Sequence, residues 1–305
     1  MTFDTFKNHS VTMNKKRFAI FGNVYQEKKS MAVQKMFNVL LAHDAELAVE
    51  RGFYTFLTEG HKIDVPPCSI IDGSDFESDI VISMGGDGTF LNVASRVGDK
   101  QIPILGVNTG RLGFLSCITA EDIEPMIAEI YADDYLVADH SVLKVTCDEE
   151  QLTGYPFALN EVSILKHDSS SMISINTCIN NEYLTTYQAD GLLVSTPTGS
   201  TAYSLSVGGP VIYPQSANIL LTPVAPHSLN MRPLVLNDNV EVEMKVESRS
   251  HSFLISIDGR SQSCREGVHI KVKKAPFTVK VISRKGQSFF STIRHKMMWG
   301  ADNRN

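Results

Sequence analysis

The sequence predicts an α/β domain with a parallel sheet, followed by a β-rich domain that is mostly antiparallel and sandwich-like. From about residue 17 to 135, short apolar runs alternate with helical stretches, which is typical of a parallel sheet with both faces covered. From about residue 140, apolar and polar residues alternate with a period of two, which indicates half-buried antiparallel strands. The 305 residues are enough for two ordinary domains.

The first domain is predicted from its apolar runs and its helix formers. We expect strands at 17–23, 79–84 and 102–107, and helices over 28–51 and 121–135. Gly22 is expected to end the first strand, and Pro125 must sit in the first turn of its helix, where a missing N–H costs nothing.

The second domain is predicted from four alternating stretches, which are 240–247, 252–258, 269–273 and 277–283. Residues 289–300 have a more helical character and are expected to pack back on the first domain. We expect residues 13–139 to form the α/β domain with 285–305 returning to it, 140–284 to form the β-rich domain, and 1–12 to be a disordered extension.

Composition limits the classes of function. The formal charge of −6 argues against general affinity for nucleic acid, so a polyanionic substrate would need a locally built site. No apolar run approaches the roughly 20 residues of a membrane helix, and no membrane partner is expected. The five cysteines are odd in number and far apart, with no CxxC pair. This pattern favours free thiols in a reducing cytoplasm over disulfides or a structural zinc site.

Three glycines surround one carboxylate where the strand at 79–84 ends: Gly85, Gly86, Asp87 and Gly88, followed by Thr89. Glycines between a strand and a helix let a phosphate approach the backbone N–H groups and the positive end of the helix dipole. A carboxylate beside phosphates is useful if it accepts a proton from an attacking hydroxyl or helps to hold Mg²⁺. The structural alternative is a tight turn in which Asp87 is an N-cap.

This loop matches neither GxxxxGK[ST] nor GxGxxG. It resembles the GGDGT phosphate motif that is shared by NAD kinases, diacylglycerol and sphingosine lipid kinases and, more distantly, phosphofructokinases. Five further segments resemble segments of NAD kinases and follow one another in the order found in that family. They are 108–115, 158–165, 189–212, 221–236 and the terminal KMMWG. Lipid kinases share only the opening motif. The resemblance covers roughly residues 17–300.

The resemblance implies an enzyme that transfers a phosphoryl group from ATP, with Mg²⁺, to the 2′-hydroxyl of the adenosine ribose of NAD. Asp87 would accept the hydroxyl proton. Gly85, Gly86, Gly88 and Thr89 would hold the donor phosphates. No metal-binding residue set is expected in the protein, because the metal would be carried largely by the nucleotide.

The resemblance also places NAD on the second half of the chain, where hydroxyl residues and an aromatic ring suit a nucleoside. The residues expected to bind its adenosine part are Thr201, Ala202, Tyr203, Ser204, Leu205 and Ser206, and Thr198 of the same loop is also expected to bind the nucleotide. Asn160 and Glu161 are expected to hold ribose hydroxyls, and Asp190 is expected to accept from the nicotinamide carboxamide. Further contacts are expected from Gln188, Ala225, Phe114 against the adenine, and Arg260.

Two positions depart from the family pattern. Asn92 stands five residues after Asp87, where many relatives have a basic residue that Arg96 could replace from the next helical turn. Gln188 stands where several bacterial relatives have arginine. The family also implies a homotetramer or homodimer with the nicotinamide site near a subunit interface. The alternatives left open are a lipid kinase and a regulatory module that binds a nucleotide without catalysis.

Overall fold

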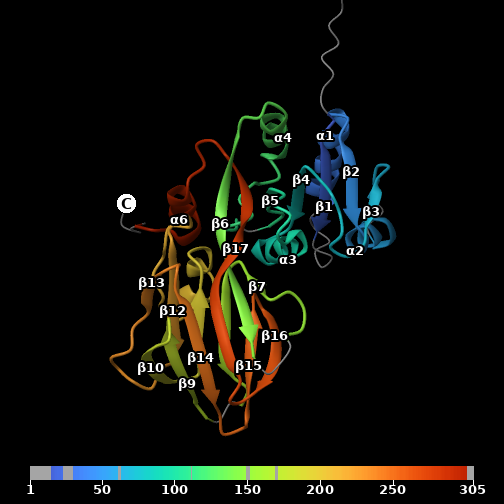
Figure 1. The fold of residues 1–305 in the computed structure, drawn as a ribbon. Helices are drawn as coiled ribbons and strands as arrows, with labels where there is room; N and C mark the ends of the chain where they lie inside the picture. Colours follow the sequence, from blue (N-terminus) through green and yellow to red (C-terminus); the bar gives the residue numbers. More distant parts are fainter. Residues whose placement is uncertain are drawn as a thin grey trace, which may run out of the picture.

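The computed structural model describes residues 15–22, 30–60, 63–110, 112–148, 152–168 and 171–300, so the expected extension at 1–12 lies outside the described residues. The described strands form one sheet of 11 strands and one of 6 strands. Figure 1 shows the α/β part at the top of the molecule and the β-rich part below it. The predicted fold class is therefore confirmed.

The α/β part contains a parallel sheet with the strand order β5-β4-β1-β2-β3. Its strands are β1 (Arg17–Gly22), β2 (Glu46–Glu50), β3 (Ser69–Ile71), β4 (Ile80–Met84) and β5 (Ile104–Val107). Its helices are α1 (Ser30–Ala42), α2 (Arg51–Thr55), the π-helix η2 (Phe56–Gly60), α3 (Asp87–Val97) and α4 (Ile123–Tyr131). Phe37 of α1 and Ile127 of α4 share one buried cluster, whereas Phe90 and Val93 of α3 belong to another.

The helix predicted over 28–51 is wrong beyond Ala42, and residues 28 and 29 lie outside the described residues. The chain turns at Asp44, which has a positive φ of 52°. Residues 46–50 then form β2, in which Leu47 and Val49 are buried. The strand pairs with β1 on the parallel sheet, and this tertiary pairing outweighs the helix propensity of the segment.

The β-rich part is a sandwich of two layers, as predicted. Its strands are β6 (Tyr135–Cys147), β7 (Phe157–Ala158), β8 (Glu161–Lys166), β9 (Ile173–Ile179), β10 (Glu182–Ala189), β11 (Gly191–Ser195), β12 (Asn218–Val224), β13 (Leu234–Asn237), β14 (Glu241–Glu247), β15 (Ser252–Ile257), β16 (Arg260–Arg265) and β17 (His269–Arg284). One layer has the order β13-β12-β11-β8-β15-β16, and the other contains β10, β9, β14 and β17 with β6. Val162 and Leu192 of the first layer share a buried cluster with Ile175 and Val246 of the second.

The two parts are joined by long strands and not by a flexible linker. The predicted stretches 269–273 and 277–283 form one strand, β17, with an irregularity between Lys274 and Thr278. β17 pairs with β14 and β6 in the sandwich and continues in parallel with β5, which makes one sheet continuous through both parts (Figure 1). The proposed boundary between residues 139 and 140 falls inside β6.

The chain returns to the junction of the two parts after β17. Helix α6 (Phe289–Met297) begins at a capping box between Ser288 and Ser291. The ring of Phe289 lies 6.2 Å from Phe114 and 5.7 Å from Tyr213, measured between ring centroids. Two short helices, η3 (Thr198–Thr201) and α5 (Tyr203–Ser206), complete the described elements. No helix in the described part of the chain is long and apolar enough to cross a membrane.

Candidate functional site

Asp87 lies at the carboxyl end of β4 and is the first residue of α3. Its carboxylate accepts hydrogen bonds from three backbone N–H groups. Oδ2 lies 2.9 Å from the nitrogen of Phe114, and Oδ1 lies 3.0 Å from the nitrogens of Leu115 and Ser116. The alternative that Asp87 is an N-cap is wrong, because Gly86 holds that position without a side-chain hydrogen bond. The three amides fix the orientation of a carboxylate that remains 29% exposed.

Gly113 makes this orientation of the carboxylate possible, and it was not among the residues predicted for the site. A Cβ atom at Gly113 would lie 2.0 Å from Oδ1 of Asp87, which is far below any real contact. The glycine is therefore required for the carboxylate to reach the amides of residues 114–116. The only signal in the sequence is a glycine directly before the segment that Asp87 contacts.

The glycines beside Asp87 differ in their structural roles. A Cβ at Gly85 would lie 2.3 Å from Oγ1 of Thr89, so the fold itself requires Gly85. A Cβ at Gly86 or Gly88 would meet nothing within 4 Å, and neither residue has a positive φ. Their amides belong to the first turn of α3, where N–H groups have no partner within the helix. The space in front of them suits an anionic ligand that approaches the backbone closely.

A second carboxylate organises the segment at 159–161. Asp258, in the turn between β15 and β16, accepts the amides of Leu159 at 2.7 Å, Asn160 at 2.8 Å and Glu161 at 3.1 Å. Burial raises the pKa of Asp258, and the three amides and the charge of Arg260 oppose this shift. The sequence did not single out Asp258, although it repeats the relationship between Asp87 and residues 114–116.

The side chains of Asn160 and Glu161 carry buried oxygens that lack a partner among the described residues: Oδ1 of Asn160 and Oε2 of Glu161. Burial raises the pKa of Glu161 to about 7, the charge of Asp258 adds to the rise, and a hydrogen bond from the backbone of Tyr203 opposes it. Buried oxygens normally have donors. Sugar hydroxyls would supply them.

The loop at 195–206 lies directly against this pair. A Cβ at Gly199 would lie 2.1 Å from the carbonyl oxygen of Asn160, so only glycine allows the approach. Thr198 donates to or accepts from Nδ1 of His140 at 2.8 Å, and Ser204 bonds to the hydroxyl of Thr222 at 2.8 Å. These two buried hydroxyls hold the loop in place. The other residues expected to bind adenosine are more open: Thr201, Ala202 and Leu205 are half-buried, and Tyr203 and Ser206 are exposed.

The two halves of the candidate site are packed together. Phe90, Leu115 and Leu159 belong to one buried cluster. Phe90 follows Thr89, Leu115 follows Phe114, and Leu159 precedes Asn160. The structure therefore brings the glycine loop, the segment whose amides bind Asp87 and the Asn160–Glu161 pair to one region.

The residues expected at the nicotinamide end form a separate group. Asp190 pairs with Lys166 at 2.8 Å, and its amide donates to the carbonyl of Val224, next to Ala225. Gln188 donates to Oγ of Ser174 at 2.9 Å. Gly191 and Ser195 are the two ends of β11, and Ser195 pairs with Glu161. Four residues of strand separate the ends by about 13 Å, so the two groups of predicted residues lie at opposite ends of β11.

Three other predicted residues already have partners within the chain. Phe114 is half-buried and packs against Phe289. Arg260 donates to the carbonyls of Ile257 at 3.0 Å and Phe157 at 2.9 Å. Arg96 donates through Nε and Nη2 to the carbonyl of Gly73, at 3.0 Å and 2.6 Å. Arg96 is therefore committed elsewhere, and the expectation that it could replace the missing basic residue has no support from its contacts.

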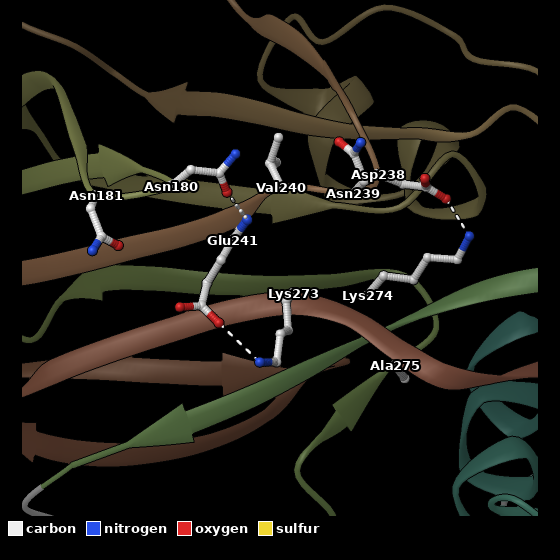
Figure 2. Close-up of a pocket in the computed structure, with 9 residues that line it drawn as sticks. All are labelled: Asn180, Asn181, Asp238, Asn239, Val240, Glu241, Lys273, Lys274 and Ala275. Carbon is white, nitrogen blue, oxygen red and sulfur yellow. Dashed lines mark hydrogen bonds and ion pairs between the residues drawn. The ribbon is translucent and has the colours of Figure 1, made fainter.

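A polar pocket of about 700 Å³ lies apart from these residues, between the turns at 180–181 and 238–240 and strand β17. Figure 2 shows that its lysines face carboxylates: Lys273 pairs with Glu241 at 3.0 Å and Lys274 pairs with Asp238. Both charges are thus neutralised within the chain. No predicted site residue lines this pocket. Among the described residues, no group of three His, Cys, Asp or Glu side chains could hold a metal ion.

Comparisons with known proteins show the family of the chain. Residues 18–135 match the model of the ATP-NAD kinase N-terminal domain, and residues 159–284 match that of the C-terminal domain. The NAD kinase of Bacteroides fragilis is 55% identical over 94% of this chain and 99% of the relative. The NAD kinase of Porphyromonas gingivalis is 43% identical over the same shares of the two chains.

Two solved structures share the fold. Yeast NADH kinase complexed with NADH has a TM-score of 0.84 at 23% identity, covering 94% of this chain and 89% of that one. An NAD kinase from Archaeoglobus fulgidus in complex with ATP has a TM-score of 0.73 at 24% identity, covering 92% and 98%. Both family models that match this chain describe NAD kinase domains, so the alternative that the chain is a lipid kinase is not supported.

Proposed function

This chain belongs to the NAD kinase family, and we propose from that premise that it transfers the γ-phosphoryl group of ATP to the 2′-hydroxyl of the adenosine ribose of NAD. The products are NADP and ADP. The observation that carries the proposal is the fixed carboxylate of Asp87 beside glycine amides with open space before them. A phosphate cradle and a proton acceptor are thus adjacent.

Asp87 acts as the general base in this proposal. The ribose oxygen attacks the γ-phosphorus in line, and its proton passes to the carboxylate as the bond to the leaving group loosens. The amides of Phe114, Leu115 and Ser116 keep the carboxylate from rotating. A positioned base contributes about 10²–10⁴-fold to the rate. Positioning and charge neutralisation supply the remainder.

The residues proposed for NAD follow the line of β11. Asn160 and Glu161 hold the ribose hydroxyls through their buried oxygens, and Tyr203 offers an exposed ring for the base. Asp190 and Gln188 lie toward the nicotinamide end. Because Asp190 pairs with Lys166, the N–H group of the carboxamide would bind the Asp190 carboxylate beside Lys166 or in its place.

Mg²⁺ enters as the complex with ATP and is therefore part of a substrate in this proposal. Polyphosphate oxygens bind Mg²⁺ strongly, and the ion keeps several waters. The described residues contain no cluster of three metal-ligating side chains. Gly86, Gly88 and Thr89 hold the phosphates that carry the ion.

We further propose a homotetramer or homodimer in the cytoplasm, without a nucleic-acid or membrane partner. The family resemblance suggests the oligomer and a nicotinamide site near a subunit interface. All five cysteines are free thiols, which suits a reducing compartment. The formal charge of −6 does not favour a nucleic-acid partner. Sedimentation at several protein concentrations, with and without NAD, tests the oligomer.

The function is tested by incubating the purified protein with ATP, Mg²⁺ and NAD and measuring NADP with an NADP-specific dehydrogenase. Parallel reactions with NADH as acceptor and with polyphosphate as donor establish the substrate range. NADP that appears with time and in proportion to enzyme supports the proposal. Binding of NAD without any NADP would instead favour the non-catalytic regulatory module.

A further inference from the structure

The C-terminal helix α6 is anchored on the segment that clamps Asp87. Gln287, just before the helix, donates to the carbonyl of Cys117 at 3.1 Å. Phe289 packs against Phe114, and Thr292 and Ile293 are buried. These contacts fix the register of α6 relative to the amides of residues 114–116. A side chain in the last turn of α6 therefore has a defined position beside the site.

Lys296 occupies that last turn. Its Nζ lies 3.4 Å from Oδ2 of Asp87 and 4.3 Å from the centroid of the Phe114 ring. Side chains of Lys296 and Asp87 are 31% and 29% exposed, so both remain accessible to a ligand. Partly exposed ion pairs contribute little to stability. Folding alone therefore gives little reason for a cation at this place.

Phosphoryl transfer does give a reason. The transferred group carries negative charge on its outer oxygens, and Asp87 adds another negative charge beside it. Position 92, where the resemblance implied a basic residue in many relatives, is asparagine. Two other cations of helix α3 and its end, within the described residues, are engaged elsewhere. Arg96 donates to the carbonyl of Gly73, and Lys100 donates to the carbonyls of Arg96 and Val97. Among the described residues, Lys296 is the one that forms an ion pair with Asp87.

We propose that Lys296 is the cation of the phosphoryl-transfer centre, supplied from the other end of the chain. This inference rests on the proposed kinase function. In the free enzyme the ammonium pairs with Asp87. When the ribose hydroxyl donates to Oδ2, the ammonium moves to a non-bridging oxygen of the γ-phosphoryl group. A bond then forms between the ribose oxygen and phosphorus, the bond from phosphorus to the bridging oxygen of ADP breaks with its electron pair left on ADP, and the ribose proton passes to Asp87. Lys296 keeps its protons throughout.

The test compares Lys296→Met, Lys296→Arg and the control Lys285→Met with the unmodified enzyme. Lys285 precedes α6 and pairs with Asp134, and both side chains are more than half exposed, so the control removes a lysine of the same segment that lies away from Asp87. Lys296→Met should lower kcat by about 10²–10³-fold, while the KM for NAD changes by less than about threefold. Lys296→Arg should recover about tenfold of that loss, because it keeps the charge but not the geometry. Lys285→Met should match the unmodified enzyme.

Thermal unfolding and calorimetric binding of NAD separate a chemical role from a structural one. We expect the Lys296→Met protein to unfold at the same temperature and to bind NAD as the unmodified enzyme does. A kcat within threefold of the unmodified enzyme, equal losses in the Met and Arg variants, or a parallel loss of folding and NAD binding would each overturn the role of Lys296. If the unmodified enzyme forms no NADP, the proposed function itself fails.

Discussion

The imidazole of His140 and the hydroxyl of Thr198 form a buried hydrogen bond, with 2.8 Å between Nδ1 and Oγ1. His140 belongs to β6, and Thr198 opens the short helix of the hydroxyl-rich loop. Burial lowers the pKa of His140 from 6.5 to about 4, and the charge of Asp139 opposes the shift. The ring is thus neutral at pH 7, and the loop is held by an uncharged contact.

This contact predicts sensitivity to acid. In the unfolded chain His140 binds a proton below about pH 6.5, whereas in the folded chain it does so only below about pH 4. The contribution of His140 to the free energy of unfolding should therefore fall across that interval, by up to about 3 kcal/mol at 1.36 kcal/mol per pKa unit. The raised pKa of Glu161 acts in the opposite direction over nearly the same interval, so the effect of His140 is read from a comparison with a variant that lacks it. Urea unfolding of the unmodified protein and of His140→Gln, at pH 7, 5.5 and 4, checks this. Glutamine keeps a hydrogen-bonding group without titrating. The stability of His140→Gln relative to the unmodified protein should therefore increase as the pH falls from 7 to 4, and equal pH dependence in both proteins would contradict the prediction.

The glycines of the phosphate loop should respond differently to substitution by alanine. Gly88→Ala adds a Cβ to an exposed helical position that is empty within 4 Å, so it should stabilise the fold by up to about 1 kcal/mol. The same methyl group would occupy space proposed for donor phosphates, and we expect the KM for ATP to rise about tenfold or more, a loss of at least about 1.4 kcal/mol of binding. Thermal unfolding and initial rates at varied ATP measure the two effects.

Gly85→Ala is the matched control, because its Cβ would collide with Thr89. This variant should lose about 1–3 kcal/mol of stability through overpacking. The proposed phosphate cradle would be refuted if Gly88→Ala left the KM for ATP unchanged.

The base is tested by Asp87→Asn. The amide oxygen can still accept the N–H groups of Leu115 and Ser116, but the side chain no longer takes a proton. NADP formation should fall by about two to four powers of ten. Calorimetry should show NAD binding largely preserved, because Asn160 and Glu161 are untouched. Near-normal turnover would reject the role assigned to Asp87.

Burial of the Glu161 carboxyl group should cost stability at neutral and higher pH. Its folded pKa of about 7 lies above the ordinary value of 4.5, so the folded state holds a proton that the unfolded chain releases. The stability that protonated Glu161 contributes is fully present below pH 4.5 and is lost as the pH rises through about 7. Glu161→Gln should therefore stabilise the protein at pH 8 by about 2–3 kcal/mol and have no such effect at pH 4.

The same substitution should raise the KM for NAD, because glutamine replaces one buried acceptor oxygen by a donor. Chemical unfolding at pH 4 and pH 8, together with rates at varied NAD, measures both consequences. Equal stability of the two proteins at pH 8 would show that the carboxylate of Glu161 is not held in a costly environment.

Local patterns could predict only part of this site. The phosphate loop and the Asn160–Glu161 pair lie next to strands whose apolar runs mark them in the sequence. The hydrogen bonds of Asp258 could not be predicted from a local pattern, because its carboxylate accepts them from amides that are 97 to 99 residues away. Gly113 is needed for the contacts of Asp87 with amides that are 27 to 29 residues away. Such requirements appear only when the fold places the segments together.

The errors have the same physical origin. Residues 46–50 have helix-forming composition, yet pairing with β1 makes them a strand. Local helical spacing suggested Arg96 as a cation near Asp87, whereas the structure supplies Lys296 from 209 residues away. In both cases a long-range contact outweighed a local pattern.

The parallel pairing of β5 with β17 has a consequence for how the protein is made. Translation delivers β5 early and β17 only in the last part of the chain, so the nascent α/β half carries an open sheet edge through most of synthesis. A polypeptide stopped after β16 would retain every residue of the glycine loop but would expose that edge to other chains. The α/β part and the β-rich part therefore share one sheet, and a chain divided between them should leave an unpaired strand edge on each fragment.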